Sequence, residues 1–240
     1  MSSLRDALAP GAAGTMALDE FARWTIEALA PHGFEPGNAL ALIGVCRDEL
    51  MFAIESAIAA EWGAAFDISS LAGMVWLGSS GMAAAAHHAP GLDGRRRYVI
   101  VVMPHIGVAE DGSVGLVLRD GQHHESSACG ALVGLQQELA TGLRRDELDH
   151  DDLEMSLLRR DVVADLGPGE TPDLVALTDL VRRLASDEMA RLADGLVRNA
   201  DADVAMFSGV VVHHHDEDRV YVADAWVTLR DDAVRRALHR

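Results

Sequence analysis

Two short, unbroken apolar runs constrain the fold more than any other feature of the sequence. Residues 39–45 read ALALIGV and residues 98–103 read YVIVVM, and turn-forming residues flank the first run. A strand with one exposed face alternates apolar and polar side chains, whereas a strand covered on both faces is apolar throughout. The two runs therefore predict a parallel sheet with helices packed on both of its faces.

The rest of the chain supplies the helices and the other strands of such a sheet. Apolar residues recur every three or four positions in several segments, which predicts helices. The expected helices are residues 18–29, 48–62, 82–88, 127–140, 146–160 and 172–196, and the further expected strands are residues 71–77, 114–118, 204–213 and 219–228. We expect a single α/β domain over residues 1–240, with a mostly parallel central sheet flanked by helices and an antiparallel C-terminal edge hairpin.

The charge pattern excludes several classes of function. The formal net charge is −18, so the chain would repel a phosphate backbone, and nucleic acid is not an expected partner. Every basic residue other than histidine is arginine, which leaves no lysine for a pyridoxal phosphate Schiff base or a Walker phosphate loop. No apolar run reaches the roughly 20 residues of a membrane span, and the N-terminal segment has no secretory pattern, so we expect a cytoplasmic protein without membrane contact.

Three side chains with metal-binding chemistry follow predicted strands. Cys46 and His105 each come directly after one of the two apolar runs, and Cys129 opens the predicted helix of residues 127–140, with Ser126 or Ser127 as its expected N-cap. Ligands of open α/β sheets bind beyond the carboxyl ends of the strands, where these residues are expected to meet. Two thiolates and an imidazole suit zinc and leave a fourth position free, although two buried, inert cysteines would fit the spacing equally well.

Three motifs around these residues resemble one known family. Residues 44–49 (GVCRDE), 104–107 (PHIG) and 127–132 (SACGAL), in that order, are similar to the limiting-CO2-inducible protein B family, a divergent group of β-carbonic anhydrases. The resemblance extends from about residue 39 to residue 135. It implies a Zn²⁺ ion held by Cys46, His105 and Cys129, and the reversible hydration of carbon dioxide to bicarbonate and a proton.

The resemblance also implies a catalytic carboxylate, Asp48, and an arginine that keeps it ionised. In the ordinary β-class pattern the aspartate comes two residues after the cysteine and the arginine two residues after the aspartate. Here Asp48 keeps its place, but position 50 is leucine and the nearest arginine is Arg47. Arg47 is therefore the expected partner of Asp48, although adjacent side chains at a helix start need not face each other.

A proton released by the reaction needs a carrier, and imidazole has a suitable pKa. His87, His88, His123 and His124 are the favoured shuttle residues. The run of residues 213–215 is interpreted instead as the solvated end of the hairpin.

Two other functions remain open. A family member that keeps the scaffold without turnover would be a catalytically silent zinc-binding interaction protein. A cysteine hydrolase would use Cys129 as nucleophile and His105 as base. The family resemblance also implies a homodimer.

Overall fold

The buried apolar runs lie side by side at the centre of one mixed sheet. The computed structural model describes residues 3–239. Its main sheet has eight strands in the order β1-β9-β8-β4-β2-β3, with β10 added beside β9 and β5 beside β8. The strands are β1 (Thr15–Ala17), β2 (Leu40–Val45), β3 (Ala65–Asp67), β4 (Arg96–Met103), β5 (His105–Val108), β8 (Ala202–His214), β9 (Asp218–Thr228) and β10 (Arg235–Ala237). A second, two-stranded sheet joins β6 (Leu116–Val117) to β7 (Ser126–Ser127).

The predicted α/β class is confirmed, with a parallel centre and an antiparallel side. Strands β3, β2, β4 and β8 are parallel to one another, and β5 continues beside β8 after Pro104 ends β4. The antiparallel hairpin of β8 and β9 is present as expected. Its first strand, β8, lies inside the sheet against β4. Its second strand, β9, pairs on its outer side with β1 near one end and with β10 near the other, so only the middle of β9 is an open edge.

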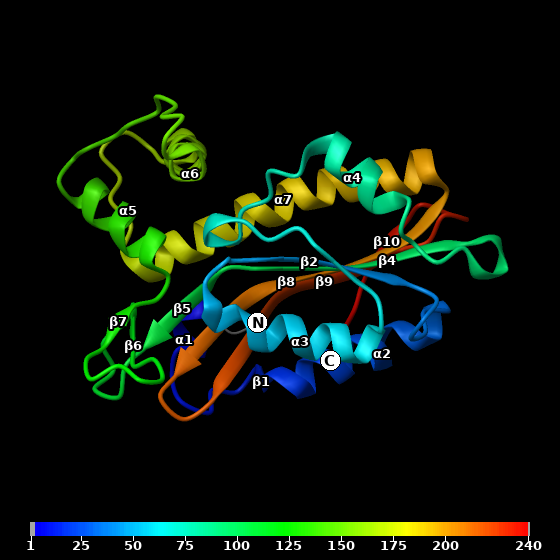
Figure 1. The fold of residues 1–240 in the computed structure, drawn as a ribbon, viewed down its shortest axis with the longest axis horizontal. Coiled ribbons are helices and arrows are strands. Elements are labelled where there is room, and N and C mark those ends of the chain that lie inside the picture. Colours follow the sequence, from blue (N-terminus) through cyan, green and yellow to red (C-terminus); the bar gives the residue numbers. More distant parts are fainter. Residues whose placement is uncertain (1–2, 240) are drawn as a thin grey trace.

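Helices cover both faces of this sheet (Figure 1). The longest, α7, packs on β8 and β4 together with α4, while α2 and α3 cover the opposite face. The helices are α1 (Leu4–Ala7), α2 (Leu18–Leu29), α3 (Phe52–Trp62), α4 (Gly78–Ala86), α5 (Gly130–Ala140), α6 (Leu153–Asp165) and α7 (Leu174–Ala200). Among the described residues, no helix is both long and apolar enough to cross a bilayer.

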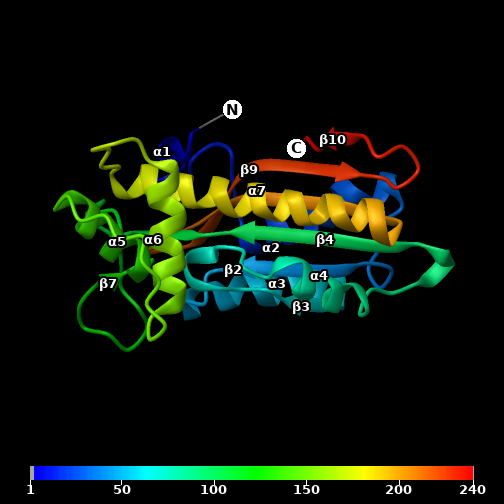
Figure 2. The ribbon, with the colours of Figure 1, turned by 90° about the horizontal axis from the view of Figure 1, so that it is seen from above.

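The elements that follow the parallel strands lie together at one end of the molecule. Figures 1 and 2 show α5, α6 and the small β6–β7 sheet together at the end toward which β5 points. The register pairs Val45 with Met103, so β2 and β4 end at the same level of the sheet. The residues that come directly after these strands are thereby placed next to each other, as the sequence predicted.

Two expected elements differ from the structure. Residues 71–77 were expected to form a strand, but Leu71–Gly73 is a hydrogen-bonded turn, because Ala72 and Gly73 adopt positive φ angles of 57° and 71° that a strand does not allow. The helix expected over residues 146–160 begins only at Leu153, since the side chain of Asp149 accepts a hydrogen bond from the backbone N–H of Asp151 and so favours a turn.

Gly107 in β5 is hydrogen-bonded to the segment before α5 and has no space for a side chain. The N–H of Gly107 donates to the carbonyl of Ala128 at 2.9 Å, and its own carbonyl accepts from Gly115 at 2.8 Å. A Cβ atom at position 107 would lie 2.6 Å from the carbonyl oxygen of Leu116 and 3.1 Å from the Cβ of Ala128. Only glycine allows the β5, β6 and Ala128 backbones to approach this closely.

Gly107→Ala should therefore lower the free energy of unfolding by about 1–3 kcal/mol, the usual effect of overpacking a closed site. Urea denaturation of the reduced, metal-free protein measures this change. Gly134→Ala is the matched control, because Gly134 lies within α5 with open space around it. That substitution should stabilise the protein by about 1 kcal/mol. Equal effects of the two substitutions would contradict the steric argument.

Candidate metal centre

The structure brings the three predicted ligands together. One ligand atom each from Cys46, His105 and Cys129 lies within 4.8 Å of the other two, and all three residues are buried. The two sulfur atoms are 3.6 Å apart. Cys46 follows β2, His105 begins β5, and Cys129 precedes α5, so three separate elements converge on this cluster.

The position of Cys129 differs slightly from the prediction. Ser126 and Ser127 form β7 rather than the N-cap of the helix, and Cys129 itself is the N-cap residue of α5. The backbone N–H groups of Ala131 and Leu132 lower the pKa of its thiol, as expected for a sulfur atom at a helix start. Cys129 is thus placed to carry negative charge.

The largest effect on the pKa of each thiol comes from the other thiol. The contact with Cys46 is the main cause that lowers the pKa of Cys129, and burial opposes it. The same contact, together with burial, raises the pKa of Cys46 far above its ordinary value. Without a metal ion the pair therefore keeps a proton on Cys46, because two thiolates this close repel each other.

His105 presents a free nitrogen to this cluster. Its Nε2 atom is buried and has no hydrogen-bond partner among the described residues, and it lies 3.7 Å from Oδ2 of Asp48. Its other nitrogen, Nδ1, is 3.1 Å from Nε2 of His213. Buried imidazole nitrogens normally have a partner, so the unpaired Nε2 beside two sulfur atoms fits a metal ligand.

Asp48 stands beside the cluster and is held by two kinds of donor. Its Oδ1 atom accepts a hydrogen bond from the N–H of Leu50 at 3.2 Å, at the start of a 3-10 helix, Glu49–Met51. Nη2 of Arg119 lies 3.2 Å from Oδ1 and 3.0 Å from Oδ2. Burial acts to raise the pKa of Asp48, but its electrostatic interactions with the His105 ring and with Arg119, together with the Leu50 N–H, outweigh burial and lower the pKa. Asp48 is therefore a carboxylate at neutral pH.

Arg119 connects this carboxylate to the loop between β6 and β7. Its Nε donates to Glu49 at 2.5 Å, and its Nη1 donates to the hydroxyl of Ser126 at 2.5 Å and to the carbonyl of Ser127 at 3.1 Å. Only 16% of the side chain is exposed. The guanidinium thus bridges the start of α3 and the segment that leads into Cys129.

Comparisons with known proteins identify the family and the fold. The sequence model of the limiting CO2-inducible proteins B/C beta carbonic anhydrases matches residues 15–231. The chain belongs to this family. Its structure resembles the crystal structure of limiting CO2-inducible protein LCIB, with 25% identity, 94% of each chain covered and a TM-score of 0.75. It also resembles PtLCIB4, a homolog of LCIB, with 20% identity, 99% of each chain covered and a TM-score of 0.79. A comparison with curated proteins gives no significant match.

In this member of the limiting CO2-inducible B/C family, Arg47 does not make the expected pair with Asp48. Nη2 of Arg47 lies 2.8 Å from Glu154, and its Nε donates to the carbonyl of Ser69 at 3.2 Å. Its side chain is 61% exposed, and its contacts are with Glu154 and Ser69 rather than with Asp48. Arg119 takes the place that the sequence suggested for Arg47, and no local spacing indicates it, since 71 residues separate it from Asp48.

The histidines are also arranged differently from the prediction. His213 and His214 are buried rather than solvated, and only His215 of that run is exposed. His88 lies beside Phe66, with ring centroids 5.4 Å apart, on the part of the chain that leads into the start of β4. His87 is exposed directly before it in the chain, and His123 and His124 lie exposed in the β6–β7 loop that carries Arg119.

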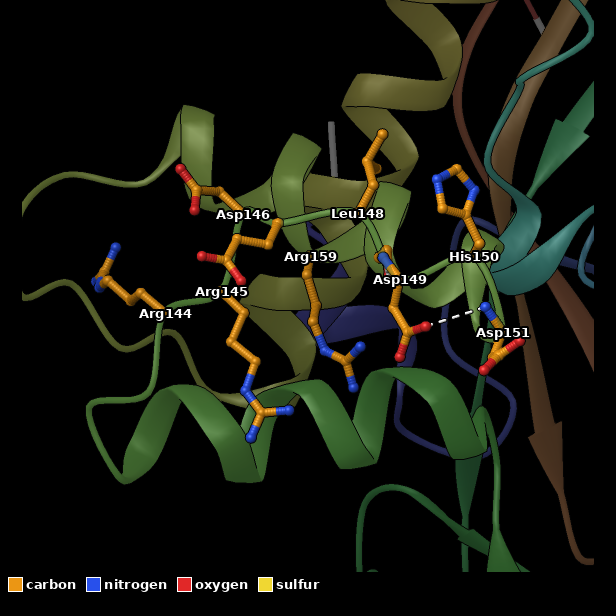
Figure 3. Close-up of a pocket in the computed structure, with 10 residues that line it drawn as sticks. Arg144, Arg145, Asp146, Leu148, Asp149, His150, Asp151 and Arg159 are labelled. Carbon is orange, nitrogen blue, oxygen red and sulfur yellow. Dashed lines mark hydrogen bonds between the residues drawn. The ribbon is translucent and has the colours of Figure 1, made fainter.

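A surface hollow elsewhere in the chain has no part in this centre. It measures about 750 Å³ and lies between α5 and α6, where the charged loop of residues 144–151 lines most of it (Figure 3). Arg159 on its floor is already paired with Glu138 at 2.8 Å. None of the three candidate ligands lines it.

The Asp48–Arg119 pair predicts a measurable coupling energy. In a double-mutant cycle with Asp48→Asn and Arg119→Met in the metal-free protein, urea denaturation at pH 7 should give a coupling energy of about 1–2 kcal/mol. The cycle of Asp48→Asn with Arg47→Met is the control and should give less than about 0.5 kcal/mol, because Arg47 pairs with Glu154. A larger coupling for Arg47 would mean that the two arginines are assigned the wrong way round.

The same coupling should depend on pH in one direction. The folded-state pKa of Asp48 is lowered, so its contribution to stability is present above the unfolded value of about 3.9 and disappears as pH falls through the folded value. Repeating the Arg119 cycle between pH 7 and pH 3 tests this. A coupling that stays constant into the acid range would show that the carboxylate charge is not involved.

Proposed function

We propose that this chain binds one zinc ion through Cys46, His105 and Cys129 and catalyses the reversible hydration of carbon dioxide. The observation that supports this most directly is the buried cluster of two sulfur atoms and an unpaired imidazole nitrogen within 4.8 Å. Two sulfur donors and one nitrogen donor suit zinc and leave a fourth coordination position for solvent or substrate. Hard cations such as magnesium and calcium prefer oxygen ligands, which this cluster lacks.

The chemistry that zinc supplies at such a site is that of a Lewis acid, which lowers the pKa of water toward neutrality. The residues of the chain supply orientation. Oδ2 of Asp48 lies 3.7 Å from Nε2 of His105, on the side of the carboxylate that faces the cluster. There it would accept the hydrogen bond of the attacking water and direct the free lone pair of its oxygen toward the carbon of carbon dioxide.

Arg119 keeps Asp48 available for this role. Its two contacts with the carboxylate oppose protonation and restrain the side chain from moving onto the metal. An aspartate held by no arginine could take the fourth position and close the site. The Asp48–Arg119 pair therefore favours an open, catalytically competent arrangement over the silent scaffold.

A cysteine hydrolase fits the geometry poorly. Cys129 is 3% exposed, and the nearest thiol to it is that of Cys46 at 3.6 Å. A nucleophile for a bulky acyl substrate needs an approach path that this burial does not leave. Stoichiometric alkylation of Cys129 that zinc does not prevent would nevertheless favour the hydrolase.

Substitutions at the cluster test the proposal. Cys46→Ser and His105→Ala should each abolish zinc binding, measured by elemental analysis, and hydration, measured by stopped flow at alkaline pH. Asp48→Ala should keep the zinc but lower kcat about 100-fold or more, since the oriented acceptor is lost. Asp146→Asn, in the charged loop of Figure 3, is the control and should change neither quantity. Stoichiometric zinc without hydration in the unsubstituted protein would support the silent scaffold instead.

Zinc affinity should rise with pH. The raised pKa of Cys46 means that it carries a proton at pH 7 in the metal-free protein, and this proton must leave when the metal binds. The apparent association constant should therefore increase at least about tenfold per pH unit between pH 6 and pH 8. Competition with a chromophoric chelator measures it. An association constant that is flat over this range would contradict binding through Cys46.

The homodimer and the cytoplasmic location stay predictions. Analytical ultracentrifugation and cell fractionation are the measurements that test them.

A further inference from the structure

A buried histidine from the last hairpin touches the candidate ligand His105. His213 lies near the end of β8, directly opposite Asp218 at the start of β9. In the parallel pairing of β5 with β8, His105 is level with Val211 and Gly107 is level with His213. Residues at the same level of neighbouring strands have side chains on the same face of the sheet, and so do residues two apart along one strand. The imidazoles of His105 and His213 therefore lie on the same face. Gly107 has no side chain between them.

The contacts form a chain of three groups. Nε2 of His213 lies 3.1 Å from Nδ1 of His105, and the two rings meet edge to face at 81° with centroids 5.1 Å apart. On its other side, Nδ1 of His213 lies 2.9 Å from Oδ1 of Asp218, which is ion-pair distance, although the geometry at Nδ1 is not that of a hydrogen bond. His105 is fully buried and His213 is 1% exposed, so protein groups rather than bulk water surround both rings.

The order of donors and acceptors in this chain follows from Asp218. A lone pair on Nδ1 would face the negative charge of this carboxylate and be repelled by it, so the proton of a neutral His213 belongs on Nδ1, which leaves a lone pair on its Nε2. That lone pair accepts the Nδ1–H of His105. His105 then has its own lone pair on Nε2, the atom that faces Cys46, Cys129 and Asp48. A metal ligand needs its lone pair on that atom.

We propose that His213, oriented by Asp218, is a positioning residue that holds His105 in the tautomer and ring orientation required to bind metal through Nε2. This role rests on the proposed metal centre. Without His213, the Nδ1–H of His105 would be buried and unpaired, which costs free energy. The ring could then turn or place its proton on Nε2, and either change removes the lone pair from the cluster.

The tautomer can be observed without metal. Long-range ¹H–¹⁵N spectra of the reduced, metal-free protein, labelled with ¹⁵N-histidine, distinguish a protonated ring nitrogen from an unprotonated one. The resonances of His105 and His213 are assigned from His105→Ala and His213→Gln. Both residues should carry their proton on Nδ1 near pH 8. His105 with its proton on Nε2 would overturn the proposal whatever the metal affinity is.

Substitutions test the effect on binding. His213→Phe removes the acceptor but keeps an aromatic ring, and it should weaken zinc binding about 10–100-fold, as loss of such outer partners does in other metal sites. His213→Gln places an amide oxygen near the position of Nε2 and should restore most of the affinity. His215→Phe is the matched control, because His215 is exposed and should not alter binding. If His213→Phe, His213→Gln and the unsubstituted protein bind zinc equally well, the proposal is overturned.

A further variant separates this inference from the proposed metal centre. If Cys46→Ser loses zinc while His213→Phe binds it like the unsubstituted protein, the centre stands and the role of His213 is wrong. If Cys46→Ser keeps its zinc, the centre itself is wrong. Urea denaturation of the metal-free variants shows whether His213→Phe folds, and if it does not, the tautomer of His105 in the unsubstituted protein decides the question.

Discussion

Two thiol groups and one imidazole nitrogen are buried side by side in this molecule, and burial of such groups without a partner is unfavourable. The sulfur atoms are close enough to share a proton, so full ionisation of both thiols requires a positive charge between them. The third donor, Nε2 of His105, has no hydrogen-bond partner within residues 3–239. A bound cation would satisfy all three groups at once. The surrounding structure is organised to hold them in this arrangement: the common level at which β2 and β4 end, the close approach at Gly107 and the start of α5.

The sequence predicts the parts of this structure that depend on local patterns. The apolar runs at residues 39–45 and 98–103 correspond to β2 and β4, and α2 has the bounds expected from its spacing. Cys46, His105 and Cys129 could be predicted as neighbours because each follows or opens a regular element, and parallel strands that end at the same level bring their next residues together.

The partners of these residues could not be predicted in the same way. Arg119 reaches Asp48 from a loop, and no periodicity specifies which loop returns to which strand. His213 follows an apolar run and precedes acidic residues, a pattern that equally fits a strand end in solvent. Its burial becomes visible only once β5 is known to pair with the far half of β8. Long-range pairing, rather than propensity, decides both positions.

Strand β8, which lies inside the sheet, is also among the last strands to be synthesised. β8 lies between β4 and β9, yet its residues come after α7, and His213 and Asp218 are encoded near the end of the chain. On the ribosome, Cys46 and Cys129 emerge long before the strand that completes their surroundings. Contacts of such wide sequence separation form slowly. We therefore expect both thiols to be accessible to metal ions and to oxidants during synthesis, before β8 is in place.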